Sequence, residues 1–230
     1  MAAAFPVVFF DLDHTLFDFE ASKRAAFEHA LNESGITEWE PLLPVLSSVE
    51  RPLWHALEAG ELTLSTLNND RFGGLVEHAD LDVDPAPLAA SYLKWLGRSG
   101  GLLDGARELL DDLASTHTLA MLSNGYSSVQ RARLANFELG QYFESVTISD
   151  EIGWAKPDKR FFDHALEQAG NPPRDSILMV GDNLRSDITG ASAAGLATCW
   201  YNPDGAPVTV DQEHVTFEVG HLDQVGELVK

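Results

Sequence analysis

The sequence has few cysteines, few basic residues and no long apolar run, and each shortage excludes a class of protein. Its single cysteine, Cys199, cannot form an internal disulfide, and its apolar neighbours indicate a core residue rather than a nucleophile. No run approaches the ~20 apolar residues of a membrane-spanning helix. The N-terminus lacks the basic flank of a secretory signal. We therefore expect a cytoplasmic protein without membrane partners.

Basic residues are outnumbered by acidic ones. Lysine and arginine total 15 against 36 aspartates and glutamates, which gives a formal net charge of −21. An acidic surface repels the phosphates of nucleic acids and anionic lipids, so we expect no nucleic acid partner. The charge does not identify a substrate, and a small anionic ligand would need a local cationic pocket or a metal ion.

The hydrophobic pattern changes twice along the 230 residues. Residues 5–10 are short, apolar and rich in Val and Phe, which predicts a buried strand. Helical spacing then dominates, with helices expected at 21–35, 47–60, 63–79 and 85–96. From residue 102 onward, short apolar strands alternate with helices, which is typical of βαβ units and a parallel sheet. The expected strands are 117–124, 145–150, 176–182 and 197–202, and the expected helices are 104–114, 127–137, 159–170 and 186–195.

This pattern predicts an α/β protein with a Rossmann-like parallel sheet. Residues 1–15 and 97–230 are expected to form the core, and residues 16–96 a helical domain inserted after the first strand. The first strand should therefore pair with strands far along the chain.

Four of the predicted strands lead into groups that can perform chemistry. The first runs into Asp11, Asp13 and Thr15, although acids at a buried strand end repel one another unless a cation lies nearby. The others are followed by Ser123 and Asn124, by Lys156, and by Asp182 and Asp187. Because ligands bind at the carboxyl ends of parallel strands, we expect these groups to meet at one edge of the sheet.

The segments DLDHT, LSNG, AKPD and GDNLRSD match, in this order, the four motifs of the haloacid dehalogenase superfamily. A single D-x-D motif is unspecific, but four motifs in order at strand ends are specific, and they span the predicted core. The resemblance implies the fold of that superfamily, with residues 16–96 as a helical cap of the C1 type. It also implies a Mg²⁺ cofactor.

The resemblance assigns chemical roles to the acids. Asp11 is the expected nucleophile, which forms an aspartyl phosphate. Asp13 is the expected general acid and base, and its backbone carbonyl is an expected metal ligand. Asp11 and Asp182 are expected to bind Mg²⁺, and Asp187 is expected either to bind it through water or to hold neighbouring groups in place.

The remaining motif residues are expected to bind the substrate. The resemblance implies that Ser123, the backbone amide of Asn124 and Lys156 bind phosphoryl oxygens, and that the charge of Lys156 also stabilises the nucleophile. His14 lies between the two catalytic acids, but the chemistry gives an imidazole no task there.

Asp13 favours a phosphatase over a dehalogenase, since a dehalogenase has no leaving alkoxide to protonate. The segments RPLWHALEAGELT, TLNNDRF, FDHALEQAGNP and AGLATCWYN resemble bacterial pyrimidine 5′-nucleotidases, which remove the 5′-phosphate of UMP, dUMP and dTMP. The expected partner is thus a small phosphorylated metabolite, a pyrimidine nucleotide, bound by a monomer or homodimer. Phe17 and Trp54 are candidates for stacking on the base.

Three alternatives remain open. One is a phosphatase for a sugar phosphate, such as an acylneuraminate 9-phosphate or phosphoglycolate. Another is a receiver-like signalling module, which shares the strand-end acids but is typically about half this length and has no helical insert. The third is a catalytically silent family member kept for binding.

Overall fold

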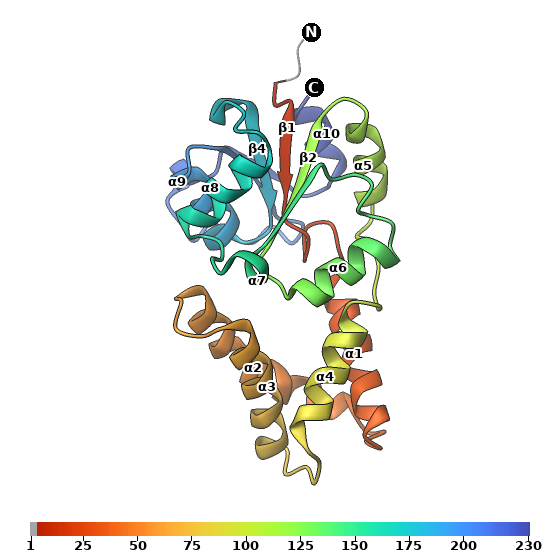
Figure 1. Ribbon diagram of the computed structural model, residues 1–230. Helices are drawn as coiled ribbons and strands as arrows, with labels where there is room; N and C mark the ends of the chain where they lie inside the picture. Colours follow the sequence, from red (N-terminus) through yellow and green to blue (C-terminus); the bar gives the residue numbers. More distant parts are fainter. Residues whose placement is uncertain (1–3) are drawn as a thin grey trace. The chain divides into compact units, whose positions relative to one another are not determined.

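In the computed structural model, which describes residues 4–230 apart from the side chain of Glu58, the chain forms two compact units (Figure 1). The core unit comprises residues 4–18, Leu102–Ser127 and Phe137–Lys230, and the helical unit comprises Phe19–Gly101 and Ser128–Asn136. This division differs from the predicted one chiefly at helix α6 (Ser127–Asn136), which was expected in the core and belongs with the helical unit instead.

Buried contacts explain the position of α6. The guanidinium of Arg133 donates hydrogen bonds to the Leu96 carbonyl (Nε–O 3.2 Å) and to the Ser22 hydroxyl (Nη2–Oγ 3.0 Å). A Cβ atom added to Gly97 would lie 2.8 Å from the Cβ of Ala132, so the two backbones approach as closely as glycine allows. The sequence pattern of α6 alone does not reveal these partners, because they lie far away in the chain.

The core unit is built on a six-stranded parallel sheet with the order β3-β2-β1-β4-β5-β6. The strands are β1 (Val7–Phe10), β2 (Thr118–Ser123), β3 (Ser145–Ile148), β4 (Ile177–Gly181), β5 (Ala197–Tyr201) and β6 (Phe217–Val219). The predicted α/β fold with a parallel sheet is confirmed. Strand β1 lies between β2 and β4, where the strand order reverses, and ligands bind at such a point in open parallel sheets.

Helices cover both faces of this sheet, and Figure 1 shows α8 and α9 on one side and α5 and α10 on the other. The helices of the core unit are α5 (Ala106–Ala114), α7 (Ser149–Ile152), α8 (Lys159–Gln168), α9 (Gly190–Ala193) and α10 (Asp223–Leu228), with short turns η2 (Arg174–Ser176), η3 (Leu184–Thr189) and η4 (Gln212–His214). All residues of β1 and β4 are buried, as expected for strands covered on both faces. Phe9 of β1 belongs to the same buried apolar cluster as Phe161 and Phe162 of α8.

The helical unit contains α1 (Phe19–Glu33), η1 (Glu40–Leu42), α2 (Leu43–Glu58), α3 (Leu64–His78) and α4 (Pro85–Leu96) in addition to α6. The predicted helices of this region are present, with α1 packed on α4 and α2 packed on α3. The apolar stripe of α1, with Phe27, Ala30 and Leu31, is fully buried. Among the described residues, no helix combines the length and the apolar character needed to cross a membrane.

Candidate active site

Three carboxylates meet at the carboxyl edge of the sheet. Asp11 follows β1, Asp182 follows β4, and Asp187 lies in the turn η3. One oxygen atom from each lies within 4.8 Å of the others. Because β1 and β4 are parallel neighbours, residues 170 positions apart in the sequence end at the same place. The predicted convergence of these acids is present in the structure.

The ammonium group of Lys156 lies among these acids. Its Nζ is 2.6 Å from Asp11 Oδ1 and 2.7 Å from Asp187 Oδ1, and it also donates a hydrogen bond to the Leu122 carbonyl at 2.8 Å. Only 1% of Lys156 is exposed, so water screens this charge very little. The structure therefore brings a buried cation against two of the three carboxylates of this cluster.

The side chain of Asn124 holds the backbone of Lys156. Asn124 Oδ1 accepts from the Lys156 amide (2.7 Å), and Asn124 Nδ2 donates to the Lys156 carbonyl (2.8 Å). This two-way pairing fixes the loop that carries the lysine. Sequence reasoning assigned only the backbone amide of Asn124 and missed this positioning role, because the pairing depends on the conformation of two loops.

Burial and charge shift the pKa values of the cluster. Burial raises the pKa of Asp11 to about 7, against the opposing effect of Lys156. Burial, together with the neighbouring Asp11 and Asp187, also raises the pKa of Asp182 well above its usual value. Burial disfavours the charged form of Lys156, but Asp11 and Asp187 outweigh this effect and raise its pKa.

The cluster fits a divalent cation. Three carboxylates against one ammonium leave an excess of two negative charges when all are ionised, and this repulsion adds to burial, the larger cause, in raising the pKa of Asp11 and Asp182. All the donor atoms of this acidic cluster are oxygens, the ligands that Mg²⁺ prefers. Mg²⁺ therefore suits the residues of this site.

Thr15 connects the loops that carry Asp11 and Asp182. Its buried hydroxyl lies 3.3 Å from Asp11 Oδ2 and 3.3 Å from Asp182 Oδ1, and it accepts a hydrogen bond from the Asp182 amide at 3.1 Å. The indole of Trp200 donates to the Asp182 carbonyl at 2.8 Å. Sequence reasoning noted Thr15 without a role and did not select Trp200, although both fix the position of a predicted ligand.

Asp187 is held by a π-helical turn, η3, which replaces the first part of the helix predicted over 186–195, and the regular helix α9 begins only at Gly190. The side chain of Asn183 caps this turn by accepting from the amides of Arg185 and Ser186, each at 3.0 Å. The Asn183 amide donates to Asp187 Oδ2 at 3.1 Å. A Cβ atom at Gly181 would lie 2.5 Å from Asp187 Cγ, so the acid occupies space that only glycine leaves open. Such π turns often lie at functional sites.

The other predicted motif residues also lie at the ends of β1 and β2. Asp13 is partly exposed, two positions after Asp11, in a turn closed by a hydrogen bond from the His14 amide to the Phe17 carbonyl (2.9 Å). Ser123 is buried, and its hydroxyl accepts from the Gly125 amide at 3.0 Å. His14 is exposed and has a positive φ of 63°.

The two residues predicted to stack on a base have different environments. Phe17 has no exposed surface and makes an edge-to-face contact with Phe137, with ring centroids 4.9 Å apart. Its environment makes it a packing residue, so the predicted stacking on Phe17 is not supported. Trp54 lies in α2, is partly exposed, and has the Arg71 guanidinium 5.9 Å from its ring centroid. Its role toward substrate stays a prediction.

Comparisons with known proteins agree with this geometry. Pyrimidine 5′-nucleotidase YjjG of Escherichia coli (strain K12) is 37% identical over 195 residues, which cover 85% of this chain and 85% of that protein. Pyrimidine 5′-nucleotidase PynA of Streptococcus pneumoniae is 36% identical, covering 84% of this chain and 82% of its own. Lower similarity extends to phosphatases named for sugar phosphates, such as N-acylneuraminate-9-phosphatase of Mus musculus, which is 29% identical over 88% of this chain and 85% of that protein.

A solved structure shares the whole fold. The crystal structure of the HAD-hydrolase YfnB from Bacillus subtilis, bound to magnesium, has a TM-score of 0.89 and 29% identity, and the match covers 97% of this chain and 98% of that one. Residues 5–195 match the family described as haloacid dehalogenase-like hydrolase. This range includes every motif residue discussed above. The chain therefore belongs to the haloacid dehalogenase-like hydrolases.

Proposed function

We propose that the protein is a Mg²⁺-dependent phosphatase that hydrolyses phosphate monoesters through an aspartyl phosphate on Asp11, with pyrimidine nucleoside 5′-monophosphates as its substrates. The observation that carries the phosphatase proposal is the buried Lys156 ammonium bound to both Asp11 and Asp187. A carboxylate that attacks an anionic ester is repelled by it, so a preorganised positive charge beside the nucleophile is the main requirement of the reaction.

Asp11, Asp182 and the backbone carbonyl of Asp13 would hold Mg²⁺, with Asp187 acting through a water molecule. When bound, the ion supplies positive charge that lowers the repulsion between the nucleophile and the phosphoryl group. The Ser123 hydroxyl, whose oxygen accepts from the Gly125 amide, would donate to a phosphoryl oxygen of the bound substrate.

The chain's own groups account for both steps of hydrolysis. In the first, an oxygen of Asp11 bonds to phosphorus, the ester bond to the leaving oxygen breaks, and the carboxyl group of Asp13 protonates that oxygen. In the second, Asp13 removes a proton from water, which attacks phosphorus, releases inorganic phosphate and restores Asp11. Lys156 remains charged throughout and binds a phosphoryl oxygen.

Our proposal that the substrates are pyrimidine nucleotides rests on the similarity to YjjG and PynA, which extends over most of the chain. The partly exposed ring of Trp54 supplies a flat surface in the helical unit. A second candidate, a sugar phosphate, is favoured by the weaker similarity to N-acylneuraminate-9-phosphatase.

A phosphate-release assay tests both parts of the proposal, the phosphatase reaction and the preference for pyrimidine nucleotides. The protein with Mg²⁺ is given equal concentrations of dTMP, UMP, dUMP, AMP, phosphoglycolate and an acylneuraminate 9-phosphate. We expect the highest kcat/KM for the pyrimidine nucleotides, no turnover by Asp11→Asn, and normal turnover by Asp112→Asn, which removes an exposed acid. A Trp54→Ala variant should change the ranking of the nucleotides more than the rate of chemistry.

Each contrary outcome has a distinct meaning. Faster release from a sugar phosphate would refute the substrate and keep the phosphatase. Full activity after exhaustive removal of divalent ions would contradict the role of Mg²⁺. Lasting phosphorylation of the folded protein by acetyl phosphate, without hydrolysis of any ester, would favour the receiver-like alternative. The absence of both phosphorylation and hydrolysis would favour a catalytically silent binding protein.

A further inference from the structure

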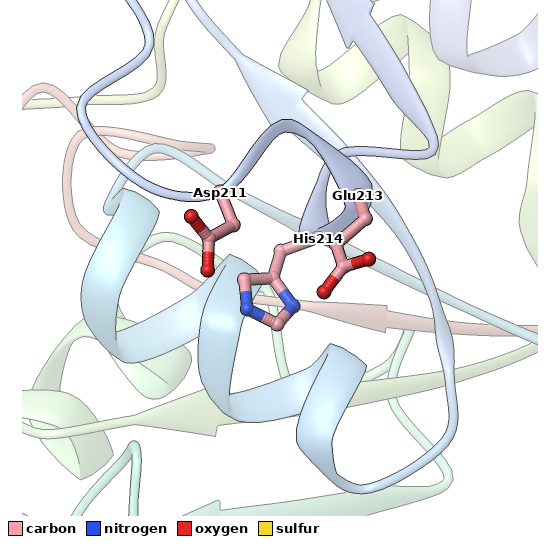
Figure 2. A group of neighbouring side chains, drawn as sticks. All are labelled: Asp211, Glu213 and His214. Atoms are coloured by element: carbon pink, nitrogen blue, oxygen red, sulfur yellow. The ribbon is translucent and has the colours of Figure 1, made fainter.

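A second group of metal-binding side chains lies on the core unit, in the connection between β5 and β6. Glu213 and His214 lie in the short turn η4 and Asp211 directly precedes it, and one donor atom from each of the three lies within 4.8 Å of the others (Figure 2). Figure 2 shows the imidazole of His214 between the two carboxylates. Both acids are exposed and His214 is partly buried.

The imidazole of His214 is fixed by residues outside this group. The hydroxyl of Ser192, in α9, lies 2.9 Å from His214 Nδ1, and the hydroxyl of Thr198, in β5, donates to the His214 carbonyl at 2.5 Å. A metal-binding histidine typically has its other ring nitrogen hydrogen-bonded in this way, which sets the tautomer and the direction of the ring. The pairing with Ser192 leaves Nε2 as the nitrogen that can bind an ion.

Among the described residues, neither carboxylate forms an ion pair with a lysine or arginine. Within residues 4–230, Nε2 of His214 has no protein partner. Two unneutralised acids beside an oriented imidazole, on a chain with net charge −21, attract a cation rather than an anion.

We propose that Asp211, Glu213 and His214 bind a divalent transition-metal ion of the zinc type. Imidazole nitrogen together with carboxylate oxygen suits Zn²⁺, whereas Mg²⁺ prefers oxygen ligands alone. Two ligand atoms bonded to one zinc ion at ~2.0–2.2 Å lie at most ~4.4 Å apart. The donor atoms here lie within 4.8 Å of one another, so a small rotation of the exposed acid side chains would bring them within bonding distance of the ion. The site differs in donor type from the all-oxygen cluster of Asp11, Asp182 and Asp187.

Metal binding here would join η4 to α9 through the His214–Ser192 pair, and so stabilise the β5–β6 connection. Zinc binding is measured by calorimetric titration of the Asp182→Asn variant in excess Mg²⁺, which weakens competing binding at the acidic cluster. We expect one bound Zn²⁺, a raised thermal unfolding temperature, and a ~10–100-fold weaker affinity in each of the added substitutions Asp211→Asn, Glu213→Gln and His214→Gln.

His221→Gln is the matched control, because His221 is exposed and lies in the same unit. Its zinc affinity should equal that of the parent. With Co²⁺ as the probe, the visible absorption of the bound ion should be lost on His214→Gln and kept in the control. Zinc binding that is unchanged by His214→Gln, or that Mg²⁺ displaces completely, would overturn the proposal, and so would the absence of zinc binding by the folded parent.

Discussion

The ammonium of Lys156 lies 2.6 Å from Asp11 and 2.7 Å from Asp187, while Asp13 lies outside this pairing, partly exposed. The two acids of the first motif therefore have different environments. The buried one, Asp11, is paired with a cation, which suits the nucleophile proposed above. The other keeps contact with solvent, which suits an acid that exchanges a proton with the leaving group and then with water.

Replacing Asp13 by Asn should lower turnover by ~10²–10⁴-fold, the range typical of general acid–base catalysis. The fold should be retained, because Asp13 is partly exposed and Asn has nearly the same shape. Pre-steady-state phosphate release and acid-quench detection of phosphoenzyme separate the two steps. Wild-type rates in both steps would exclude Asp13 as the proton-transfer group.

Acidity should stabilise the protein once divalent ions have been removed. Burial raises the pKa of Asp11 from 3.8 to about 7, so between these values the folded state binds a proton that the unfolded state lacks. The free energy of unfolding then falls as the pH rises from about 4 to about 7. Asp182, with its raised pKa, acts in the same direction.

Thermal unfolding from pH 4 to 8 in the presence of a chelator measures this effect. We expect the Asp11→Asn variant to show a shallower decline, and saturating Mg²⁺ to restore stability at the alkaline end. A decline of equal slope in Asp11→Asn would contradict the assignment to Asp11.

At the scale of elements, Asp187 of the turn η3 packs directly against Gly181 at the end of β4. Gly181→Ala would place a Cβ atom 2.5 Å from Asp187 Cγ, and the acid would have to move away from Lys156. We expect a loss of ~1–3 kcal/mol in the free energy of unfolding, as is typical of overpacking, and a large drop in phosphate release.

Gly73→Ala is the control for this substitution. No atom lies within 4 Å of a Cβ at Gly73, which is inside α3, so alanine there should stabilise by ~0.5–1 kcal/mol or leave stability unchanged. Urea unfolding and phosphate release compare the two variants. An active and stable Gly181→Ala would show that the position of Asp187 is not set by this contact.

The elements that the sequence predicted well are those with strong periodicity. Strands β1 and β4 lack polar side chains, β2 is apolar between Thr118 and Ser123, and all three lead into motif residues, so their place beside the candidate site followed from the pattern. Strand β6 was missed because it has only three residues, two of them not buried. The turn η3 was predicted as regular helix because its shape depends on the Asn183 cap and the contact with Gly181.

At the scale of the whole molecule, the chain crosses four times between the two units, since α6 belongs to the helical unit. A simple insert would need two crossings. Arg133, the fully buried guanidinium of α6, bonds to Leu96 and Ser22, so it joins segments that are far apart in the sequence.

Arg133→Ala should therefore lower the free energy of unfolding by ~1.5–3 kcal/mol, the range for hydrogen bonds to a charged group. Arg131→Ala, in the same helix but exposed, should change it by less than ~0.5 kcal/mol. Urea unfolding monitored by circular dichroism measures both. Equal effects of the two substitutions would indicate that the buried bonds of Arg133 contribute little.

The helical unit is made of two segments that are separate in the sequence, and this limits how the unit can be exchanged between related proteins. If recombination moved only residues 19–101 into a related protein, these residues would have to pack against that protein's own version of helix α6. The contacts of α6 with its original neighbours would be lost. A chimaera that keeps its packing must carry residues 128–136 as well. Exchange of the helical unit between related proteins should thus involve two separate gene segments together.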